Sequence, residues 1–338
     1  MVAIRPVVAL LSLTVAASLL TACRGGSGSA PDKAGGSTGP VVLRLGSTDF
    51  ADQSESPAIR YFADQVAKVS NGQLRIRIVY DAGGDRTAAG EENVIRKVES
   101  GKLDLGWIAA RAWDEVGVKS FTALQAPFLI TSYSLLGRVT SSPLATRMLD
   151  GLSARNDVGL ALVPMELRHP SGGLKHRLVA VRDFRGARIR DIPSRVGDDL
   201  LRALGARPVH VSNAAISGVL AHRRIDGSEV ALETAGFGSV VTANVTFFAK
   251  AMTLFAGQKA FDALAADQRA WLKTAAGRML PYILAKPPWR GAFARYCRNG
   301  GRVVRASRDD LTGLERASRP VSAALERDRK STRLNSSH

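Results

Sequence analysis

Residues 94–108 read VIRKVESGKLDLGWI, and this stretch decides the fold class. Apolar residues recur at helical spacing over 94–98, and Gly101 ends the helix. Residues 103–108 then form a short, mostly apolar run that is typical of a buried strand. A helix that leads directly into a strand is the repeating unit of α/β proteins, so the stretch predicts helices packed on a sheet.

The chain before this stretch has the same alternation. Residues 41–47 (VVLRLGS) and 74–80 (LRIRIVY) have the pattern of strands. Residues 56–70 between them place apolar side chains on one helical face and are followed by an Asn-Gly pair. This order predicts an α/β fold with a largely parallel sheet. A similar helix, turn and strand recur over residues 216–232 (ISGVLAHRRIDGSEVAL), as a protein with two related lobes would show.

The amino terminus has the features of a bacterial lipoprotein leader. Residues 7–22 are apolar and uncharged, but they are too few for the roughly 20 residues of a membrane-spanning helix. Leu20-Thr21-Ala22-Cys23 resembles a lipobox, which implies removal of residues 1–22 and a lipid on Cys23. An ordinary secretory signal with an accidental cysteine is the alternative. Residues 23–40 are rich in Gly, Ser and Pro and predict a flexible linker, so we expect an extracytoplasmic, membrane-anchored protein.

Composition excludes several classes of function. The chain has 47 Lys and Arg against 30 Asp and Glu, but the basic residues are scattered and show no RNA-binding signature. A surface that faces an anionic membrane or cell wall explains this charge better. Cys297 is the only cysteine besides Cys23, and the five histidines form no i, i+4 pair, so we expect no disulfide, metal or cofactor. The sequence contains no nucleophile elbow, zinc-protease motif or phosphate loop, so no motif predicts an enzyme.

Seven short stretches have an order and spacing that one protein family shares. They are SNG (70–72), VESGKLDL (98–105), APFL (126–129), FRGARIR (184–190), LGA (204–206), IDG (225–227) and FDAL (261–264). With them, the chain resembles the solute-binding proteins of tripartite ATP-independent periplasmic (TRAP) transporters, of the dicarboxylate-binding type. The resemblance covers about residues 41–325.

The resemblance implies a two-lobed, periplasmic-binding-protein-like α/β fold with a ligand cleft between the lobes and a long bracing helix. Lobe I is expected over 41–166 and 256–325, and lobe II over 167–255. Residues 261–296 fit the bracing helix, kinked by their prolines. Residues 326–338 are expected to be a disordered or non-native tail.

The resemblance also implies that the protein captures a small organic acid. Arg190 matches a family arginine that forms a two-pronged salt bridge with the ligand carboxylate, a geometry that suits a guanidinium group. Arg168 matches a second arginine that contacts the ligand or stabilises the closed form, and a surface arginine near a hinge is the alternative. Glu91 matches a carboxylate that contacts polar ligand groups, although a glutamate placed to suit a helix dipole would look the same.

One position departs from the family pattern. Val230 stands where the family has an asparagine whose amide holds the ligand carboxylate. Ser194 or Ser228 is then expected to supply the missing donor, and Glu229 would favour a ligand that carries donor groups.

Two further candidates follow the strand 103–108. Arg111 and Trp113 are expected to line the cleft, because ligands of open α/β sheets bind beyond the carboxyl ends of strands. A place in the hydrophobic core is the alternative for Trp113.

The expected partners are a small organic acid, the integral membrane permease subunits of a TRAP transporter and, through the anchor, the membrane. We expect a monomer that does not bind nucleic acid. A binding lipoprotein of an ABC-type or sensor system is the alternative function, and an extracytoplasmic enzyme has the least support.

Overall fold

The computed structural model describes residues 39–52, 55–84, 88–173, 176–212, 224–232 and 239–335, with side chains through 328. The expected leader, Cys23 and almost all of the linker lie outside these residues, as does the helix expected over 216–223. Residues 40–338 form one compact unit. Within the described ranges, no helix has the length and apolar character needed to cross a membrane.

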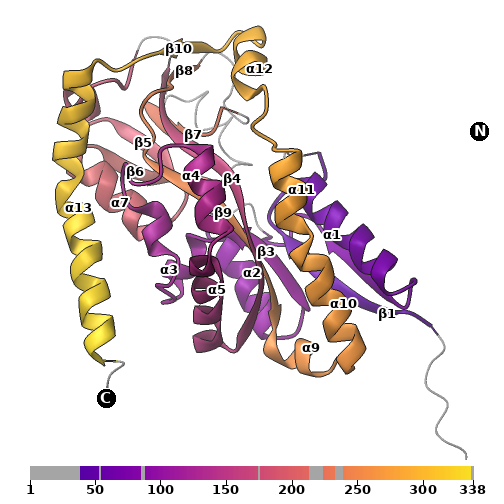
Figure 1. Cartoon of the computed structure of the whole chain (residues 1–338). Coiled ribbons are helices and arrows are strands. Elements are labelled where there is room, and N and C mark those ends of the chain that lie inside the picture. Colours follow the sequence, from indigo (N-terminus) through magenta and orange to yellow (C-terminus); the bar gives the residue numbers. More distant parts are fainter. Residues whose placement is uncertain are drawn as a thin grey trace, which may run out of the picture. The chain divides into compact units, whose positions relative to one another are not determined.

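A ten-stranded sheet organises this unit (Figure 1). Its strands are β1 (Val41–Ser47), β2 (Leu74–Val79), β3 (Leu105–Ala109), β4 (Asp157–Gly173), β5 (Arg188–Asp191), β6 (Arg207–His210), β7 (Gly227–Val230), β8 (Ser239–Thr242), β9 (Phe248–Gly257) and β10 (Arg302–Val304). The main path runs β2-β1-β3-β9-β4-β7-β5-β6, and β8 joins β4 to β10. The α/β class predicted from the sequence is confirmed.

The sheet is parallel in its outer parts and antiparallel in its middle. β1 pairs in parallel with β2 and β3, and β5 does so with β6 and β7. The two longest strands, β4 and β9, pair antiparallel from Asp157 opposite Gly257 to Arg168 opposite Phe248. The last residues of β4 then pair with β7 and β8. The prediction of a largely parallel sheet is therefore correct only for the outer parts, because the strands that connect the two halves of the sheet run in opposite directions.

Helices cover the sheet on both faces. They are α1 (Ser56–Val69), α2 (Gly90–Glu99), α3 (Ala112–Glu115), α4 (Tyr133–Thr140), α5 (Pro143–Asp150), α6 (Val181–Phe184), α7 (Arg195–Ala203), α9 (Gln258–Asp262), α10 (Ala266–Gly277), α11 (Met279–Ala285), α12 (Ala292–Arg298) and α13 (Arg308–Asn335), with 3-10 turns at Thr122–Gln125 and Gly151–Arg155. α1 and α2 bury the apolar stripes that the sequence predicted, over 56–66 and 94–98.

Residues 261–296 do not form the single long bracing helix that was expected there. Residues 261–296 instead fall into α9, α10, α11 and α12, and Arg278 separates α10 from α11. α11 ends at Ala285, just before Pro287 and Pro288, since proline removes a backbone donor and disfavours helix at the residue before it. α13 continues through Asn335, so most of the expected tail is helical, and its non-native origin stays a prediction.

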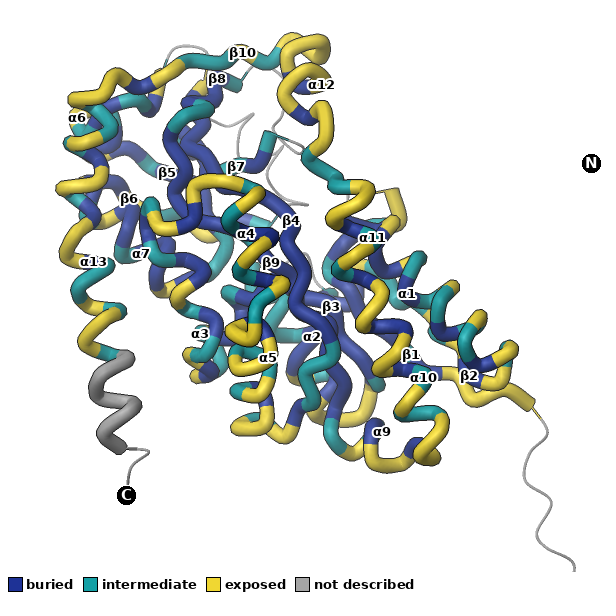
Figure 2. Tube along the Cα trace, viewed as in Figure 1, coloured by how far each residue is buried: buried dark blue, intermediate teal, exposed yellow. Residues whose placement is uncertain are grey.

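Three hydrophobic clusters fill the unit, and buried positions follow the strands in Figure 2. One cluster packs α1, α10 and α11 against one face of β1, β3, β4 and β9, and the second packs α2, α4 and α5 against the opposite face. The third cluster lies around β5 and α7 and includes Phe184, Phe247 and Leu314. The half of the molecule that carries β5 to β7 thus has a core of its own. The proposed lobe boundaries stay a prediction.

Candidate functional site

A polar pocket opens where β1 and β5 end. It holds about 650 Å³ of empty space, part of it open to solvent. Its walls are Thr48, Asp49, Phe50, Glu55, Asp81, Gly83, Gly84, Ala88, Gly90, Glu91, Arg111, Ile192, Ser212, Lys250 and Met252. Most of these follow β1, β2 and β3, whereas Ile192 and Ser212 follow β5 and β6. The pocket therefore lies beyond the carboxyl ends of parallel strands, where the sequence placed the site.

One wall of the pocket carries a pair of buried carboxyl groups. Asp49 and Glu55 are 8% and 4% exposed. Ser47 Oγ donates to Asp49 Oδ2 over 3.2 Å, and Lys250 Nζ donates to Glu55 Oε1. Glu55 Oε2 has no donor among the described residues. Burial, followed by the charge of Glu55, raises the pKa of Asp49 well above its usual value. The pair needs a hydrogen between its oxygens, from a proton or from a donor on a ligand.

Lys250 links this pair to the interior of the sheet. It lies on β9 with its Nζ 3.6 Å from Glu166 Oε2 on β4. Burial alone would lower its pKa, but the carboxylates of Glu166, Glu55 and Asp49 outweigh burial and raise the pKa. Lys250 is therefore a charged group in the pocket wall at neutral pH.

The pocket lining also includes an ion pair that is mostly buried. Arg111 Nη1 lies 2.7 Å from Glu91 Oε2, with side-chain exposures of 10% and 13%. The other oxygen, Glu91 Oε1, accepts the backbone N–H of Ala109 at 3.1 Å. Glu91 sits in the first turn of α2, and Arg111 precedes α3. Both predicted residues reach the pocket, and they are paired with each other.

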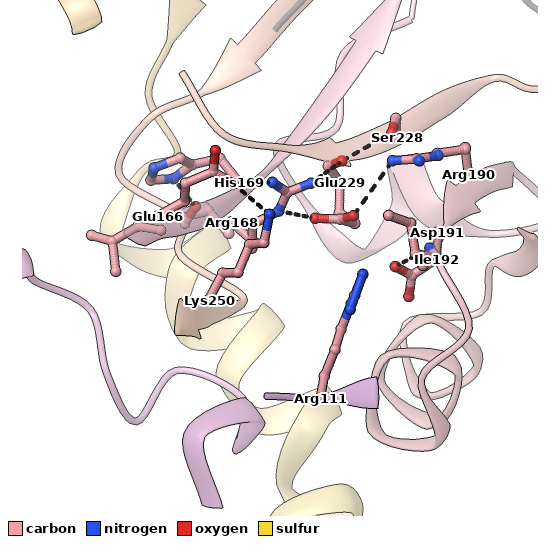
Figure 3. A network of polar contacts seen from close by, with 12 residues as sticks. Arg111, Glu166, Arg168, His169, Arg190, Asp191, Ile192, Ser228, Glu229 and Lys250 are labelled. Atoms are coloured by element: carbon pink, nitrogen blue, oxygen red, sulfur yellow. Dashed lines mark hydrogen bonds and ion pairs between the residues drawn. The ribbon is translucent and has the colours of Figure 1, made fainter. Parts of the chain in front are cut away.

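The remaining predicted charges form a buried network on β4, β5 and β7 (Figure 3). Arg168 Nη1 donates to Glu166 Oε2 at 2.7 Å, and its Nε donates to Glu229 Oε2. Arg190 Nη1 lies 3.7 Å from Glu229 Oε1, and its Nε donates to the Val211 carbonyl at 2.8 Å. Figure 3 shows the two arginines approaching Glu229 from opposite sides. Arg190 is only 2% exposed and does not line the pocket.

Electrostatics keeps most of this network ionised. Burial opposes the charge of Glu166, but Lys250 and Arg168 outweigh it and lower the pKa of Glu166. Burial lowers the pKa of Arg190, and Glu229 offsets part of that effect. Burial, with the nearby Glu229 charge, raises the pKa of Asp191 to about 8, and Asp191 Oδ2 has no partner among the described residues. Asp191 is therefore mainly protonated at neutral pH, which limits the negative charge near Glu229.

Three other predicted residues have structural places. Trp113 is fully buried against Phe255 and donates its indole N–H to Thr253 at 2.9 Å, so it belongs to the core and not to the cleft. Ser194 caps α7 by accepting the backbone N–H of Gly197 at 3.1 Å. Ser228 donates to the carbonyl of its neighbour Glu229 at 2.9 Å.

Sequence reasoning missed the carboxyl pair and Lys250. Asp49 comes just after the strand 41–47, so the rule that placed Arg111 beyond a strand end would have found it. No local signal marked Glu55 or Lys250, because they meet the pocket only through the pairing of distant strands. Among the described residues, no group of His, Cys, Asp and Glu is arranged to hold a metal ion.

Comparisons with known proteins agree with this architecture. The model for bacterial extracellular solute-binding protein, family 7, matches residues 46–324. The C4-dicarboxylate-binding periplasmic protein DctP of Rhodobacter capsulatus is 20% identical over 190 residues, which are 56% of this chain and 55% of that protein. The uncharacterized protein YiiZ of Salmonella typhimurium is 22% identical over 196 residues, 57% of each chain. This chain thus aligns with little more than half the length of these curated relatives.

Solved structures share the fold over most of the chain. A TRAP periplasmic solute-binding protein from Bradyrhizobium sp., in complex with galacturonate, has a TM-score of 0.75 at 21% identity and covers 86% of this chain and 97% of its own. The sugar-acid-binding protein DctPAm from Advenella mimigardefordensis, in complex with galactonate, has a TM-score of 0.75 at 19% identity, with 85% and 93% covered. At these identities the likeness establishes the fold.

Proposed function

The chain belongs to bacterial extracellular solute-binding protein family 7, and we propose that it captures a small hydroxylated monocarboxylic acid and delivers it to a TRAP-type membrane transporter. The observation that carries the proposal is the polar pocket, whose walls place cations and carboxylates together. Arg111 offers a guanidinium fork to the ligand carboxylate. Asp49 and Glu55 accept hydrogen bonds from hydroxyl groups at the other end of the ligand.

The same arrangement selects against a dicarboxylate. A second carboxylate placed near Asp49 and Glu55 would bring a third carboxyl group to a buried pair in which the charge of Glu55 already raises the pKa of Asp49, and like charges in a site of low polarity repel strongly. A hydroxyl group supplies the hydrogen that Glu55 Oε2 lacks. The galacturonate and galactonate complexes of structurally similar proteins fit this reading. We therefore replace the dicarboxylate expectation by an acid with one carboxylate and several hydroxyls.

Delivery and anchoring rest on the family and on the leader. Membership of the family supports transfer of the ligand to integral permease subunits outside the cytoplasm. The lipobox-like residues 20–23 support a lipid on Cys23, which metabolic labelling with palmitate tests. The pocket lies beyond strand ends, and among its described lining residues no hydroxyl or thiol is hydrogen-bonded to a base, which supports binding over catalysis.

A thermal-shift screen tests the ligand class. The library holds uronic, aldonic and other hydroxy acids beside C4-dicarboxylates and neutral sugars. We expect at least one hydroxylated monoacid to raise the melting temperature, since ligand at 100 times its Kd adds about 2.7 kcal/mol of stability. The matched neutral sugar, which lacks only the carboxylate charge, should have no effect. Stabilisation by dicarboxylates alone would contradict the proposed role of the carboxyl pair.

A further inference from the structure

A long basic segment of the chain lies at the surface. Residues 268–308 contain ten Lys and Arg residues and no Asp or Glu, whereas the whole chain mixes 47 basic with 30 acidic residues. The segment comprises most of α10, then α11, α12 and β10, which follow one side and the upper edge of the view in Figure 1. A charge run of this length produces a strong positive field, because nothing within the segment neutralises it.

At the end formed by α12 and β10, the basic side chains project into solvent. Arg290, Arg298, Arg302 and Arg305 are all exposed. Within the described part of the chain, none of these four guanidinium groups makes an ion pair or a side-chain hydrogen bond. Some other surface arginines are neutralised, as Arg155 is by Glu99 2.6 Å away. The four arginines therefore keep their full charge available for a partner.

An exposed aromatic side chain belongs to the same segment as these arginines. Phe293 on α12 is 52% exposed, which is unusual for a phenylalanine of a folded domain. It lies between Arg290 and Arg298 in sequence, and Figure 2 shows α12 exposed over much of its length. We call the group of Arg290, Phe293, Arg298, Arg302 and Arg305 the basic edge.

We propose that the basic edge binds the phosphate headgroups of an anionic membrane surface. Guanidinium forks match phosphate oxygens in charge and geometry. Each basic residue near an anionic membrane contributes about 1 kcal/mol, and an exposed aromatic ring adds apolar contact at the headgroup level. An extracellular binding-protein family meets such a surface on the outer face of the cell membrane. The edge thereby holds the protein beside the bilayer that contains its transporter.

Nucleic acid is a weaker candidate for the same charge. It also offers phosphates, but binding of single strands relies on several aromatic side chains that stack on bases. In the described basic edge, Phe293 is the one exposed aromatic ring. The family is extracellular, which also favours a membrane surface over nucleic acid as the partner.

Vesicle partitioning tests the proposal with the full chain. The protein is mixed with vesicles of phosphatidylcholine alone and with vesicles that contain about a third phosphatidylglycerol, and bound protein is measured by sedimentation. A lipid anchor or apolar leader contributes to both, so the ratio of the two partition coefficients reports the basic edge. We expect this ratio to be large at low salt and to fall as salt screens the charges.

A triple variant and a matched control identify the surface. R290S/R298S/R302S should reduce the ratio roughly a hundredfold at low salt, at about fivefold for each charge. R147S/R185S/R207S removes the same charge from exposed arginines on other elements and should change the ratio less than about threefold. F293S should weaken binding to both vesicle types in a salt-insensitive way.

Three results would overturn the proposal. One is that the wild-type chain binds anionic and neutral vesicles equally, so that the ratio of the two partition coefficients is near unity. Another is an equal loss in the two triple variants, which would mean that net charge and not this surface decides. The third is stronger competition by an acidic polypeptide or a nucleic acid than by anionic vesicles at equal charge, which would assign the edge to that partner. Melting curves of both triple variants check that the fold is intact.

Discussion

The pocket wall and the buried network use the same residue types for different purposes. In the network, Glu166, Arg168 and Glu229 satisfy one another deep between β4 and β7. In the wall, Glu55 keeps an oxygen without a donor among the described residues, and Arg111, although paired with Glu91, lines the pocket. Charges that satisfy one another hold the fold, whereas charges left incomplete beside an opening are available to a ligand.

This comparison changes the role of Arg190. The family resemblance makes it the carboxylate grip, but the structure places a carboxylate of the protein, Glu229, beside it. A ligand that reached Arg190 would have to displace Glu229 or draw Arg190 out of a site where it is 2% exposed. Arg111 also has a carboxylate partner, Glu91, but it lines the pocket, so a ligand carboxylate can approach it without entering the buried network. We therefore assign the first contact of the ligand carboxylate to Arg111.

The largest expected effect is on stability and comes from Glu229→Gln. The substitution keeps the size of the side chain but leaves Arg168 with only Glu166 and deprives Arg190 of its carboxylate. Breaking a buried ion pair typically costs about 3–5 kcal/mol. Urea unfolding, followed by circular dichroism, should show a loss of this size.

Asp226→Asn is the matched control for this change. Asp226 pairs with Arg188, and their side chains are 35% and 43% exposed, so we expect a loss of about 1 kcal/mol or less. Equal losses in the two variants would mean that the network has no special role in the fold.

The second effect is on binding and comes from Arg111→Ala. Removing the guanidinium leaves the ligand carboxylate without its partner, and we expect an affinity about 30-fold lower, or about 2 kcal/mol. Calorimetry with the acid found by thermal shift measures it. Arg195→Ala is a suitable control, because Arg195 pairs with Asp114 and Asp328 outside the pocket.

Arg190→Ala decides between the two arginines. We expect it to lower stability, much as Glu229→Gln does, and to affect binding less than Arg111→Ala. A variant that melts like the wild type yet binds 30-fold more weakly, beside an Arg111→Ala variant within threefold of wild type, would restore Arg190 as the carboxylate grip.

Local patterns predicted the elements well and the site less well. The strand over 41–47 and the helices over 56–70 and 94–101 came from periodicity, which depends on near neighbours. The division of 261–296 into four helices depends on tertiary packing as well as on prolines. Arg111 was found because it follows a strand whose carboxyl end faces the pocket, and Glu91 because it matches a position of the family.

Partners that come from distant strands were beyond sequence reasoning. Arg190 and Glu229 are brought together by the parallel pairing of β5 and β7, and no local sequence pattern near either residue predicts this contact. The same holds for Lys250, whose strand β9 crosses between the halves of the sheet. A charged residue in a family motif therefore says little about whether its charge is already satisfied.

The smallest effect tests whether an unsatisfied carboxyl group alone marks a ligand site. Asp157, at the start of β4, is 2% exposed, and neither of its oxygens has a partner among the described residues. It does not line the pocket. Burial, followed by the charge of Glu99, raises the pKa of Asp157 to about 7. Our reading predicts that Asp157 affects only stability, because it lies outside the pocket.

The sign of its pH dependence follows from the raised pKa. Between about pH 4 and pH 7 the folded chain holds a proton on Asp157 that the unfolded chain has released, so this contribution to stability is full below about pH 4 and is lost as the pH rises to 7. Asp157→Asn removes the titration. The free energy of unfolding of the wild type, minus that of the variant, should fall by about 1–2 kcal/mol across this window, after allowance for relaxation toward solvent. Ligand affinity at pH 7 should stay within about twofold in the same variant. If affinity instead falls as much as in Arg111→Ala, incomplete hydrogen bonding reports ligand contact even away from the pocket, and the contrast between pocket wall and interior fails.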